Sequence, residues 1–425
     1  MGRMRDWLTF FFTRSFLVRL GVLAALVAVG GVGVLVSGVV PVKASSGHWP
    51  ITSWVLNFAS SRSVATHSTG IRVPPLEDPD LVMLGGAHFE AACQWCHGSP
   101  SEQRPRVAGQ MTPPPPYLPN VLAQWDNAER FYIVKHGIKF AGMPAWSSRL
   151  RDDDVWPVIA FLNVLPTLDA AQYQRVVGRD IQAPETMQPE LAQLLLRCAA
   201  CHGLEGRGRV GEHSPMLAGQ REDYLYGSLA SYASAERHSG IMEPIAARLT
   251  PSQMKLLSKY FSAQSPVNAE ALQHAEAPQD AKALQRAKAS QDSKASHDAE
   301  LVSAGRRIAI EGRLIDGSTV AACASCHQAE NAKDQSMEGA RPRAHFPLLA
   351  GQSSTYLEKQ LQLFGQRIRG GTRYHHLMYP AAELLGERDR AAAAAFYGSL
   401  PSTIASPAAQ PHGVAPVLGT SESFH

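Results

Sequence analysis

The placement of its cysteines restricts this chain more than any other feature. The 425 residues contain six cysteines in three pairs, each followed directly by a histidine: CQWCH at 93–97, CAACH at 198–202 and CASCH at 323–327. In the pattern CxxCH, two thiols add across the vinyl groups of haem and the histidine becomes the proximal ligand of the iron. The sequence therefore predicts three covalently attached haem c groups as cofactors. The predicted thioether positions are Cys93, Cys96, Cys198, Cys201, Cys323 and Cys326, and the predicted proximal ligands are His97, His202 and His327.

Paired cysteines have two other common uses, a zinc site and a disulfide framework. A zinc ribbon requires CxxC pairs that close on each other, and disulfides do not require a histidine after every second cysteine. The repeated histidine therefore favours haem c over both.

The N-terminus contains a long apolar run. Leu20 to Val42 is a stretch of 23 residues without a charge, which is about the length needed to span a bilayer and longer than the apolar core of a secretory signal. Haem c is attached outside the bacterial cytoplasmic membrane, so we expect a retained single-pass anchor there, with the haem domains in the periplasm. The alternative is a long cleaved signal, with Val42-Lys43-Ala44 as an imperfect cleavage site. Four preceding arginines predict a cytoplasmic N-terminus: Arg3, Arg5, Arg14 and Arg19.

The segment after this run has an apolar stripe at helical spacing. Its members are Ile51, Trp54, Val55 and Phe58, with Trp49 nearby. Two interpretations remain open for this stripe: a short helix in the outer membrane-water boundary, or a helix packed against the first haem domain.

Composition divides the rest of the chain. The polar stretch from Thr167 to Pro189 and the Ala/Gln/Lys-rich stretch 264–300 are both interpreted as linkers. The predicted organisation is a cytoplasmic N-terminus and anchor over 1–44, a membrane-proximal segment over 45–71, haem domains over 72–168, 187–264 and 301–400, a flexible linker over 265–300 and a disordered tail over 401–425.

Each haem unit repeats one outline. A helical run leads into the cysteines, an irregular Gly/Pro-rich stretch follows, and a second helix closes the unit, starting near Asp152, Thr250 or Gly386. Asp152 and Thr250 are predicted N-caps of these closing helices. Strand signals are few, so the predicted fold class is all-α: one N-terminal transmembrane helix followed by three haem domains.

The haem units resemble class I cytochromes c. PMLAGQREDYL at 215–225 aligns without gaps to PLLAGQSSTYL at 347–357, with seven of eleven positions identical. These second and third units are similar to the halves of two-haem bacterial cytochromes c. The first unit contains VKHGIKFAGMPAWSSRLRDDDVWPVIAFL and is similar to membrane-anchored cytochrome c subunits of respiratory complexes.

The resemblance implies a sixth iron ligand and a partner for each proximal histidine. The implied sixth ligands are the methionines Met143, Met242 and Met378. In this family a proline carbonyl accepts the second ring proton of the proximal histidine. Pro215 and Pro347 match that proline, whereas the first unit has TPPPPYLP, so its equivalent is one of Pro113 to Pro116.

Other side chains compete with these methionines. The histidines are His136, His238, His375 and His376, and at most one residue of the group around Met378 can face the iron. Met111, Met216 and Met337 lie closer to their CxxCH motifs and are weaker alternatives.

Three haem units fit two classes of function. The first is an electron-transfer protein, not itself an enzyme, which passes single electrons from a respiratory dehydrogenase or quinol-oxidising complex to a terminal oxidase. Its variant is a permanent cytochrome subunit of a membrane dehydrogenase for alcohols, aldehydes or sugars. The second is a haem peroxidase, which needs an open iron site, whereas every unit here offers a methionine.

We predict electron transfer, with the membrane and redox proteins as partners. A net charge of only +3 predicts no nucleic-acid partner.

Overall fold

The structure is a computed structural model that describes residues 14–266, 298–327 and 345–401. Nearly all of the predicted linker over 265–300, the tail over 401–425 and Met337 lie outside these residues. The all-α fold class is confirmed, with one short hairpin as an exception.

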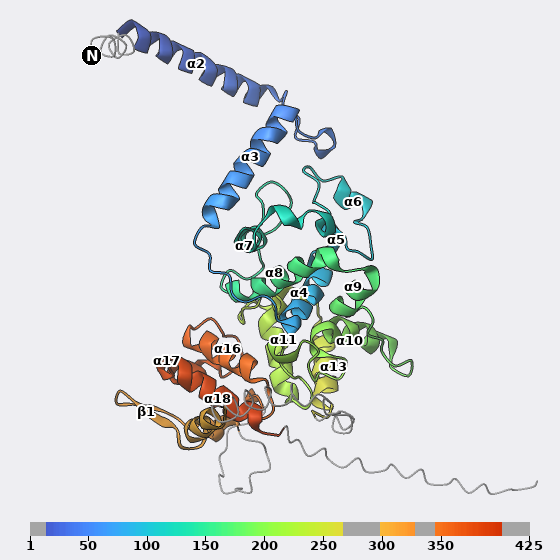
Figure 1. Ribbon diagram of the computed structural model, residues 1–425, viewed down its shortest axis with the longest axis vertical. Coiled ribbons are helices and arrows are strands. Elements are labelled where there is room, and N and C mark those ends of the chain that lie inside the picture. The colour runs from blue at the N-terminus through green and yellow to red at the C-terminus, as the bar shows by residue number, and fades with distance from the viewer. Residues whose placement is uncertain (1–13, 267–297, 328–344, 402–425) are drawn as a thin grey trace, which may run out of the picture.

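Two helices precede the haem units (Figure 1). They are α2 (Arg14–Ser37) and α3 (Pro50–His67), separated by the turn η1 (Ala44–Ser46). Phe16–Ser37 is long and apolar enough to cross a membrane, and none of it is buried inside the protein. Length and composition alone do not separate an anchor from a signal sequence.

Helix α3 contacts the first haem unit through its C-terminal half. Val64 is buried, and the His67 ring stacks on Tyr132 of α7 at 5.7 Å. The predicted stripe in the N-terminal half is exposed, with Trp54 62% and Phe58 57% accessible. Of the two interpretations of this stripe, packing against the first haem domain is therefore wrong.

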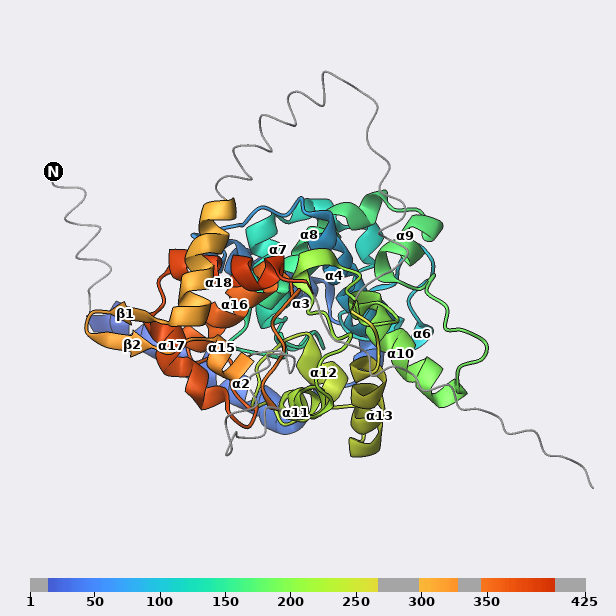
Figure 2. The same cartoon turned by 90° about the horizontal axis from the view of Figure 1, so that it is seen from below.

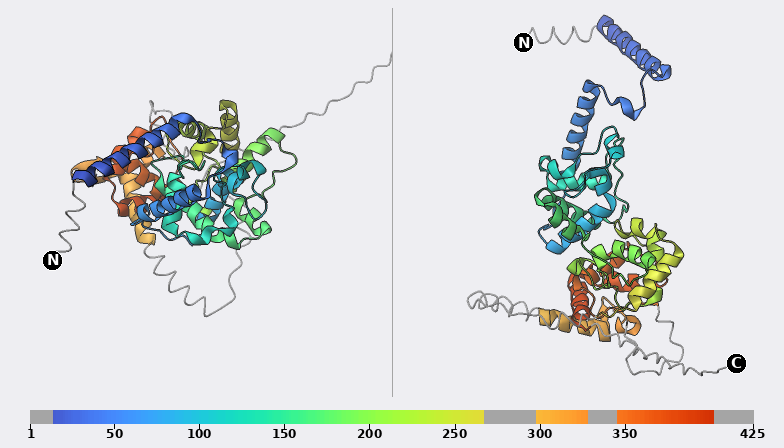
Figure 3. Two further views of the ribbon diagram at one scale, coloured as in Figure 1. Left: turned by 90° about the horizontal axis from the view of Figure 1, so that it is seen from above. Right: turned by 90° about the vertical axis from the view of Figure 1, so that its right-hand side faces the viewer.

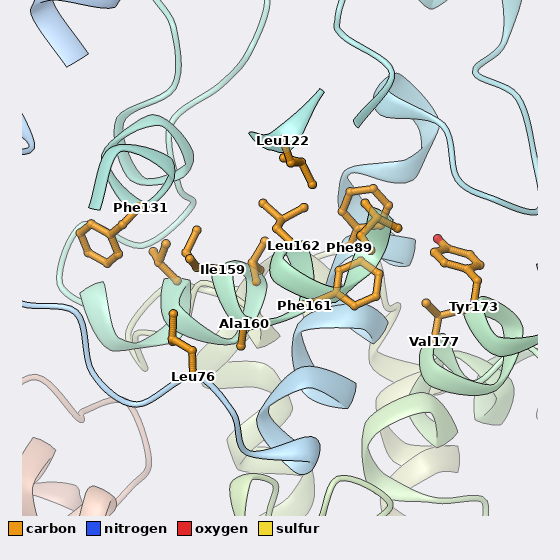
Figure 4. Packing of buried hydrophobic residues seen from close by; sticks show 13 residues of the cluster. Leu76, Phe89, Leu122, Phe131, Ile159, Ala160, Phe161, Leu162, Tyr173 and Val177 are labelled. Carbon is orange, nitrogen blue, oxygen red and sulfur yellow. The ribbon is translucent and has the colours of Figure 1, made fainter. Parts of the chain in front are cut away.

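The first haem unit has the largest core (Figure 4). Phe89 of α4 and Phe161 of α8 pack with ring centroids 5.2 Å apart, and Tyr173 of α9 lies against Phe161. At the α4–α8 crossing, a Cβ on Gly85 would lie 1.8 Å from the Pro157 carbonyl oxygen, so only glycine allows this approach. The elements are α4 (Pro79–Ala92), α5 (Gln94–His97), α6 (Arg106–Gly109), η2 (Leu118–Asn120), η3 (Leu122–Gln124), α7 (Asn127–His136), η4 (Asp152–Val155), α8 (Trp156–Val164), η5 (Leu165–Thr167) and α9 (Ala170–Val177).

Two predictions for this region were wrong. Asp152 is not an N-cap, because the closing helix begins with the 3-10 turn η4 and Asp152 forms an ion pair with Lys135 instead. The stretch from Thr167 to Pro189 is not simply a linker, because it contains α9, whose Asp169 forms a capping box with Gln172. This helix adds Tyr173 to the first core, which extends that unit beyond residue 168.

The second and third units repeat the outline around smaller cores. Thr250 caps α13 through a capping box with Gln253, as predicted. The second unit contains α10 (Pro189–His202), η6 (Gly211–His213), α11 (Glu222–Ala233), α12 (Met242–Ala246) and α13 (Pro251–Ser262). The third contains a helix over 298–311, β1 (Arg313–Ile315), β2 (Ser318–Val320), α15 (Ala324–His327), α16 (Ser354–Gly365), η8 (His375–Leu377), α17 (Met378–Leu384) and α18 (Glu387–Ser399).

Strands β1 and β2 form an antiparallel hairpin that the sequence analysis missed. Arg313 pairs with Val320, and the turn residues Asp316 and Gly317 have φ values of 49° and 78°. Asp-Gly between short strands is a common signal for this turn type. The hairpin lies between the first helix of the third unit and its CxxCH motif, so it lengthens that connection.

The three units are packed together. The second and third lie side by side, and the first lies against the second, on the side toward α3 (Figures 1 and 2). In the right-hand view of Figure 3, α2 lies at the end of the protein opposite the second and third units. Contacts of α4 with α10 and η6 join the first unit to the second, and contacts of α16 with η6 join the second to the third.

Candidate haem sites

Each proximal histidine bonds to a proline carbonyl. The distance from the histidine Nδ1 to the carbonyl oxygen is 2.9 Å for His97 and Pro116, 3.1 Å for His202 and Pro215, and 2.9 Å for His327 and Pro347. Pro215 and Pro347 are confirmed as partners, and Pro116 is identified among the four prolines of the first unit. A carbonyl can only accept, so Nδ1 carries the proton and Nε2 is left to bind a metal.

The surroundings of these motifs suit a bound neutral imidazole. Burial lowers the pKa of His202 and His327, and the bond to the proline carbonyl offsets part of that effect. Burial also raises the pKa of the Cys93 and Cys198 thiols to about 12. Buried thiols and imidazoles of this kind are suited to hold the edge of an apolar porphyrin and its iron.

The third unit contains a cavity that fits haem c. Its lining includes both cysteines and the histidine of the motif, together with Met378. The remaining wall is mostly apolar, with Leu357 and Phe364 of α16 among its members. A covalently held porphyrin needs paired thiols, one axial imidazole and an apolar slot. The residues present supply all of these.

Two of the three candidate methionines occupy comparable places, and the third lies on a loop. Met242 and Met378 are the first residues of α12 and α17. Met143 lies on a loop held by the bond from Ile138 N to its carbonyl oxygen, 3.2 Å long. Gly137 has φ +64°, and a Cβ there would lie 2.5 Å from the Met143 carbonyl oxygen, so this loop requires glycine.

The competing histidines differ in their surroundings. His136 is exposed and packs on Tyr132 at 4.6 Å, and His238 has Nδ1 3.6 Å from Glu243 Oε1. His376 is exposed. His375 lines the cavity of the third unit beside Met378 and bonds through Nδ1 to the Thr372 carbonyl oxygen at 2.6 Å.

The weaker methionine alternatives have other contacts. The backbone of Met216 forms hydrogen bonds with the Gln352 side chain. Met111 lies beside the Met143 loop, because a Cβ on Gly142 would be 2.3 Å from the Met111 Cε.

The junction between the second and third units is reciprocal. Gln220 bonds through its amide to the N–H and carbonyl oxygen of Leu348, at 2.9 and 3.0 Å. Gln352 makes the same two bonds to Met216, at 2.7 and 3.0 Å. Gln220 and Gln352 are equivalent positions of the repeated LAGQ motif. The two units therefore meet as an approximate two-fold pair.

Two buried arginines cross the same junction. Arg237 donates to the Tyr356 hydroxyl at 3.2 Å, and Arg369 donates to the Tyr224 hydroxyl at 2.7 Å. The two guanidiniums outweigh the effect of burial on Tyr224 and lower its pKa to about 8. Sequence analysis missed all four residues, although the ungapped alignment of 215–225 with 347–357 continues to Arg237 and Arg369.

Arg369 also faces the cavity of the third unit. It lines that cavity, and its Nε has no hydrogen-bond partner among the described residues. Arg237 and Arg369 are only 4% and 7% exposed, and neither forms an ion pair with a carboxylate in the part of the chain that the structure describes. A buried cation requires a counter-charge, and a haem propionate would supply one here.

Comparison with known families agrees with these sites. Residues 80–162 match the family described as cytochrome c oxidase, cbb3-type, subunit III. Residues 191–265 and 314–401 match the family described as cytochrome c. Each of the three CxxCH motifs lies within one of these matched ranges.

Three relatives are similar over about half of the chain. Cytochrome c-552 of Acidithiobacillus ferridurans is 28% identical over 55% of this chain and 84% of its own length. Cytochrome c4 of Azotobacter vinelandii is 28% identical over 48% of this chain and 84% of its own. The thiosulfate dehydrogenase electron acceptor of Thiomonas intermedia is 26% identical over 41% of this chain and 65% of its own. With the family matches and the haem sites, these likenesses identify the chain as a multi-domain class I c-type cytochrome that carries haem c and transfers electrons.

Proposed function

We propose that this protein is a membrane-anchored cytochrome with three haem c groups, which passes single electrons between periplasmic redox partners. The observation that carries the proposal is the same histidine-proline pair in all three units. Haem c supplies reversible one-electron chemistry when bound. The chain's part is to hold the iron between two fixed ligands and to keep water away from it.

Methionine is the proposed sixth ligand in each unit: Met143, Met242 and Met378. A thioether is a soft, neutral donor, so it favours ferrous iron and raises the potential relative to a second histidine. An iron with two protein ligands has no open position for peroxide. This arrangement supports electron transfer over a peroxidase.

The proposed anchor is α2, with the N-terminus in the cytoplasm. Its side chains are exposed along the whole apolar span, as lipid contact requires. The exposed stripe of α3, with Trp54 and Phe58, would then lie at the outer membrane surface, because only 12 residues separate the start of α3 from the end of α2.

The proposed electron donor is a respiratory dehydrogenase or quinol-oxidising complex, and the proposed acceptor is a terminal oxidase. One relative is named for accepting electrons from a dehydrogenase, which supports a donor of this class. Permanent membership of a membrane dehydrogenase complex is the variant of this proposal, and co-purification from solubilised membranes distinguishes the two.

The proposal is tested on the full-length protein in detergent. The dithionite-reduced protein is mixed with a purified terminal oxidase or with hydrogen peroxide, and haem absorbance is followed. We expect reoxidation by the oxidase in the presence of oxygen and negligible peroxide turnover. Rapid, saturable peroxide reduction by intact protein would contradict the proposal.

A further inference from the structure

The junction between the first and second units lies on the loop that precedes Met242. Residues 147–154 of the first unit contact residues 238–240 of the second through four hydrogen bonds. Ser147 Oγ donates to the Gly240 carbonyl oxygen at 2.8 Å, and Arg151 Nη1 donates to the His238 carbonyl oxygen at 2.9 Å. Asp154 Oδ2 accepts from Ser239 Oγ at 3.1 Å and from Gly240 N at 2.9 Å.

Ser239 continues this chain of bonds to the methionine. Its Oγ accepts from Met242 N at 3.1 Å and from Ile241 N at 3.3 Å. A hydroxyl that donates to a carboxylate has its lone pairs free to accept from these amides. One hydroxyl therefore connects a carboxylate of the first unit to the backbone of the candidate ligand in the second.

Burial makes this connection firm. Asp154 and Arg151 are each 8% exposed and Ser239 is 5% exposed. Arg151 pairs with Asp154 across one turn, which supplies the counter-charge that a buried carboxylate requires. Bonds to an ionised group away from water are stronger than bonds between neutral groups.

Shape holds the same loop in place. A Cβ on Gly240 would lie 1.8 Å from the Trp146 Nε1, so the loop backbone sits directly against the indole. Trp146 in turn packs on the buried His88 ring at 4.8 Å. The loop before Met242 is thus enclosed by side chains of the first unit as well as bonded to them.

We infer that the first haem unit positions the sixth ligand of the second haem, with Asp154 and Ser239 as positioning residues for Met242. This inference rests on the ligation proposed above. It makes the first unit part of the coordination site of the second haem, so that undocking the first unit weakens that methionine bond. In the third unit, the segment before Met378 lies against the second unit instead, since a Cβ on Gly371 would lie 2.7 Å from the Ser231 Cβ and 2.9 Å from Arg237 N.

The test uses the full-length, haem-loaded protein in its ferrous state. A methionine bound to ferrous haem gives an ε-methyl NMR resonance displaced by the porphyrin ring current. Met242→Ala identifies the resonance of the second haem by removing it. Asp154→Asn and Ser239→Ala are then expected to shift or broaden that resonance only. Ser239→Ala, which changes no charge, is also expected to lower the potential of that haem.

Asp153→Asn is the matched control, because Asp153 shares Arg151 with Asp154 but makes no bond to residues 238–240. It should leave the Met242 resonance in place. The resonances of Met143 and Met378 report whether each variant is folded. If Asp154→Asn does not fold, the result for Ser239→Ala decides the test.

An unchanged Met242 resonance in folded Asp154→Asn or Ser239→Ala would overturn the inference, even where the free energy of unfolding falls. If Met242→Ala removes no resonance, the ligand assignment is wrong and the inference fails with it. The two failures are therefore distinguished by different variants.

Discussion

The two junctions that the second haem unit forms with its neighbours are built differently. The second and third units exchange equivalent contacts, glutamine for glutamine and arginine for arginine, about an approximate two-fold axis. The first and second units exchange unlike contacts. At the loop before Met242 the first unit supplies a carboxylate, a guanidinium and an indole, and the second supplies mainly backbone. Elsewhere the second unit supplies the Arg209 guanidinium, which donates to the Val176 carbonyl oxygen, and His213, which pairs with Asp78.

The haem units are therefore joined in two ways. A reciprocal junction places equivalent groups beside both haems, so a change on one side should have a counterpart on the other. The junction of the first and second units is one-sided at the loop before Met242, where the first unit supplies most of the side chains.

Loss of the methionine ligand should have the largest effect. Met378→Ala is expected to abolish the sulfur-to-iron charge-transfer absorption of the third haem and to lower its potential by on the order of 0.1 V, within the span of roughly 0.8 V that axial ligands control. The exposed His376 provides the control, since His376→Ala should change neither property. Redox titration with near-infrared absorbance measures both. Loss of the band in His376→Ala would show that the ligand is misassigned.

Loss of a buried arginine should come next. Arg369→Ala leaves the Tyr224 hydroxyl and Gln360 without their buried partner and should lower the free energy of unfolding by about 2 to 4 kcal/mol. The potential of the third haem should also fall, because a nearby cation favours ferrous iron. Denaturant titration and redox titration measure the two effects.

Arg237→Ala should produce the same pair of effects on the second haem. Arg367→Ala is the control, because its side chain is 66% exposed and pairs with Glu383 at the surface. Arg237→Ala and Arg369→Ala should lower the free energy of unfolding by similar amounts. The reciprocal description fails if these two amounts differ by more than the change that Arg367→Ala causes.

A substitution at Gly240 should affect the one-sided junction alone. Gly240→Ala places a methyl group against Trp146 and should lower the free energy of unfolding by about 1 to 3 kcal/mol. Limited proteolysis and NMR should show changes in the first and second units and none at the third haem. Equal disturbance of all three haems would mean that the junctions are not independent.

The smallest effect is expected from the paired glutamines. Gln220→Ala and Gln352→Ala each remove two bonds to backbone groups and should each lower the free energy of unfolding by about 1 to 2 kcal/mol. Gln110→Ala, at an exposed position, is the control. If one glutamine variant clearly lowers the free energy of unfolding and the other does not, the junction is not reciprocal.

Sequence reasoning predicted what depends on local pattern. The CxxCH spacing, the Thr250 cap and the prolines Pro215 and Pro347 are short-range or repeated features, and the structure agrees with each. It failed at α9, where the capping box at Asp169 was overlooked in a polar stretch, and at the Asp316-Gly317 hairpin.

The contacts between units were not predictable in the same way. Arg237 and Arg369 recur at one register of the repeat, so the reciprocal junction left a trace in the sequence. Asp154 and Ser239 meet across 85 positions with no repeat to connect them. Their pairing follows from how the units dock, which a single sequence does not state.

The central claim is that this chain holds three haem c groups, one in each unit. Intact-mass spectrometry of the mature protein, produced in a host competent in haem c attachment, tests it most directly. We expect the mass of the chain plus three haems, with a c-type pyridine haemochrome spectrum of matching intensity. A mass gain of two haems or fewer would contradict the claim.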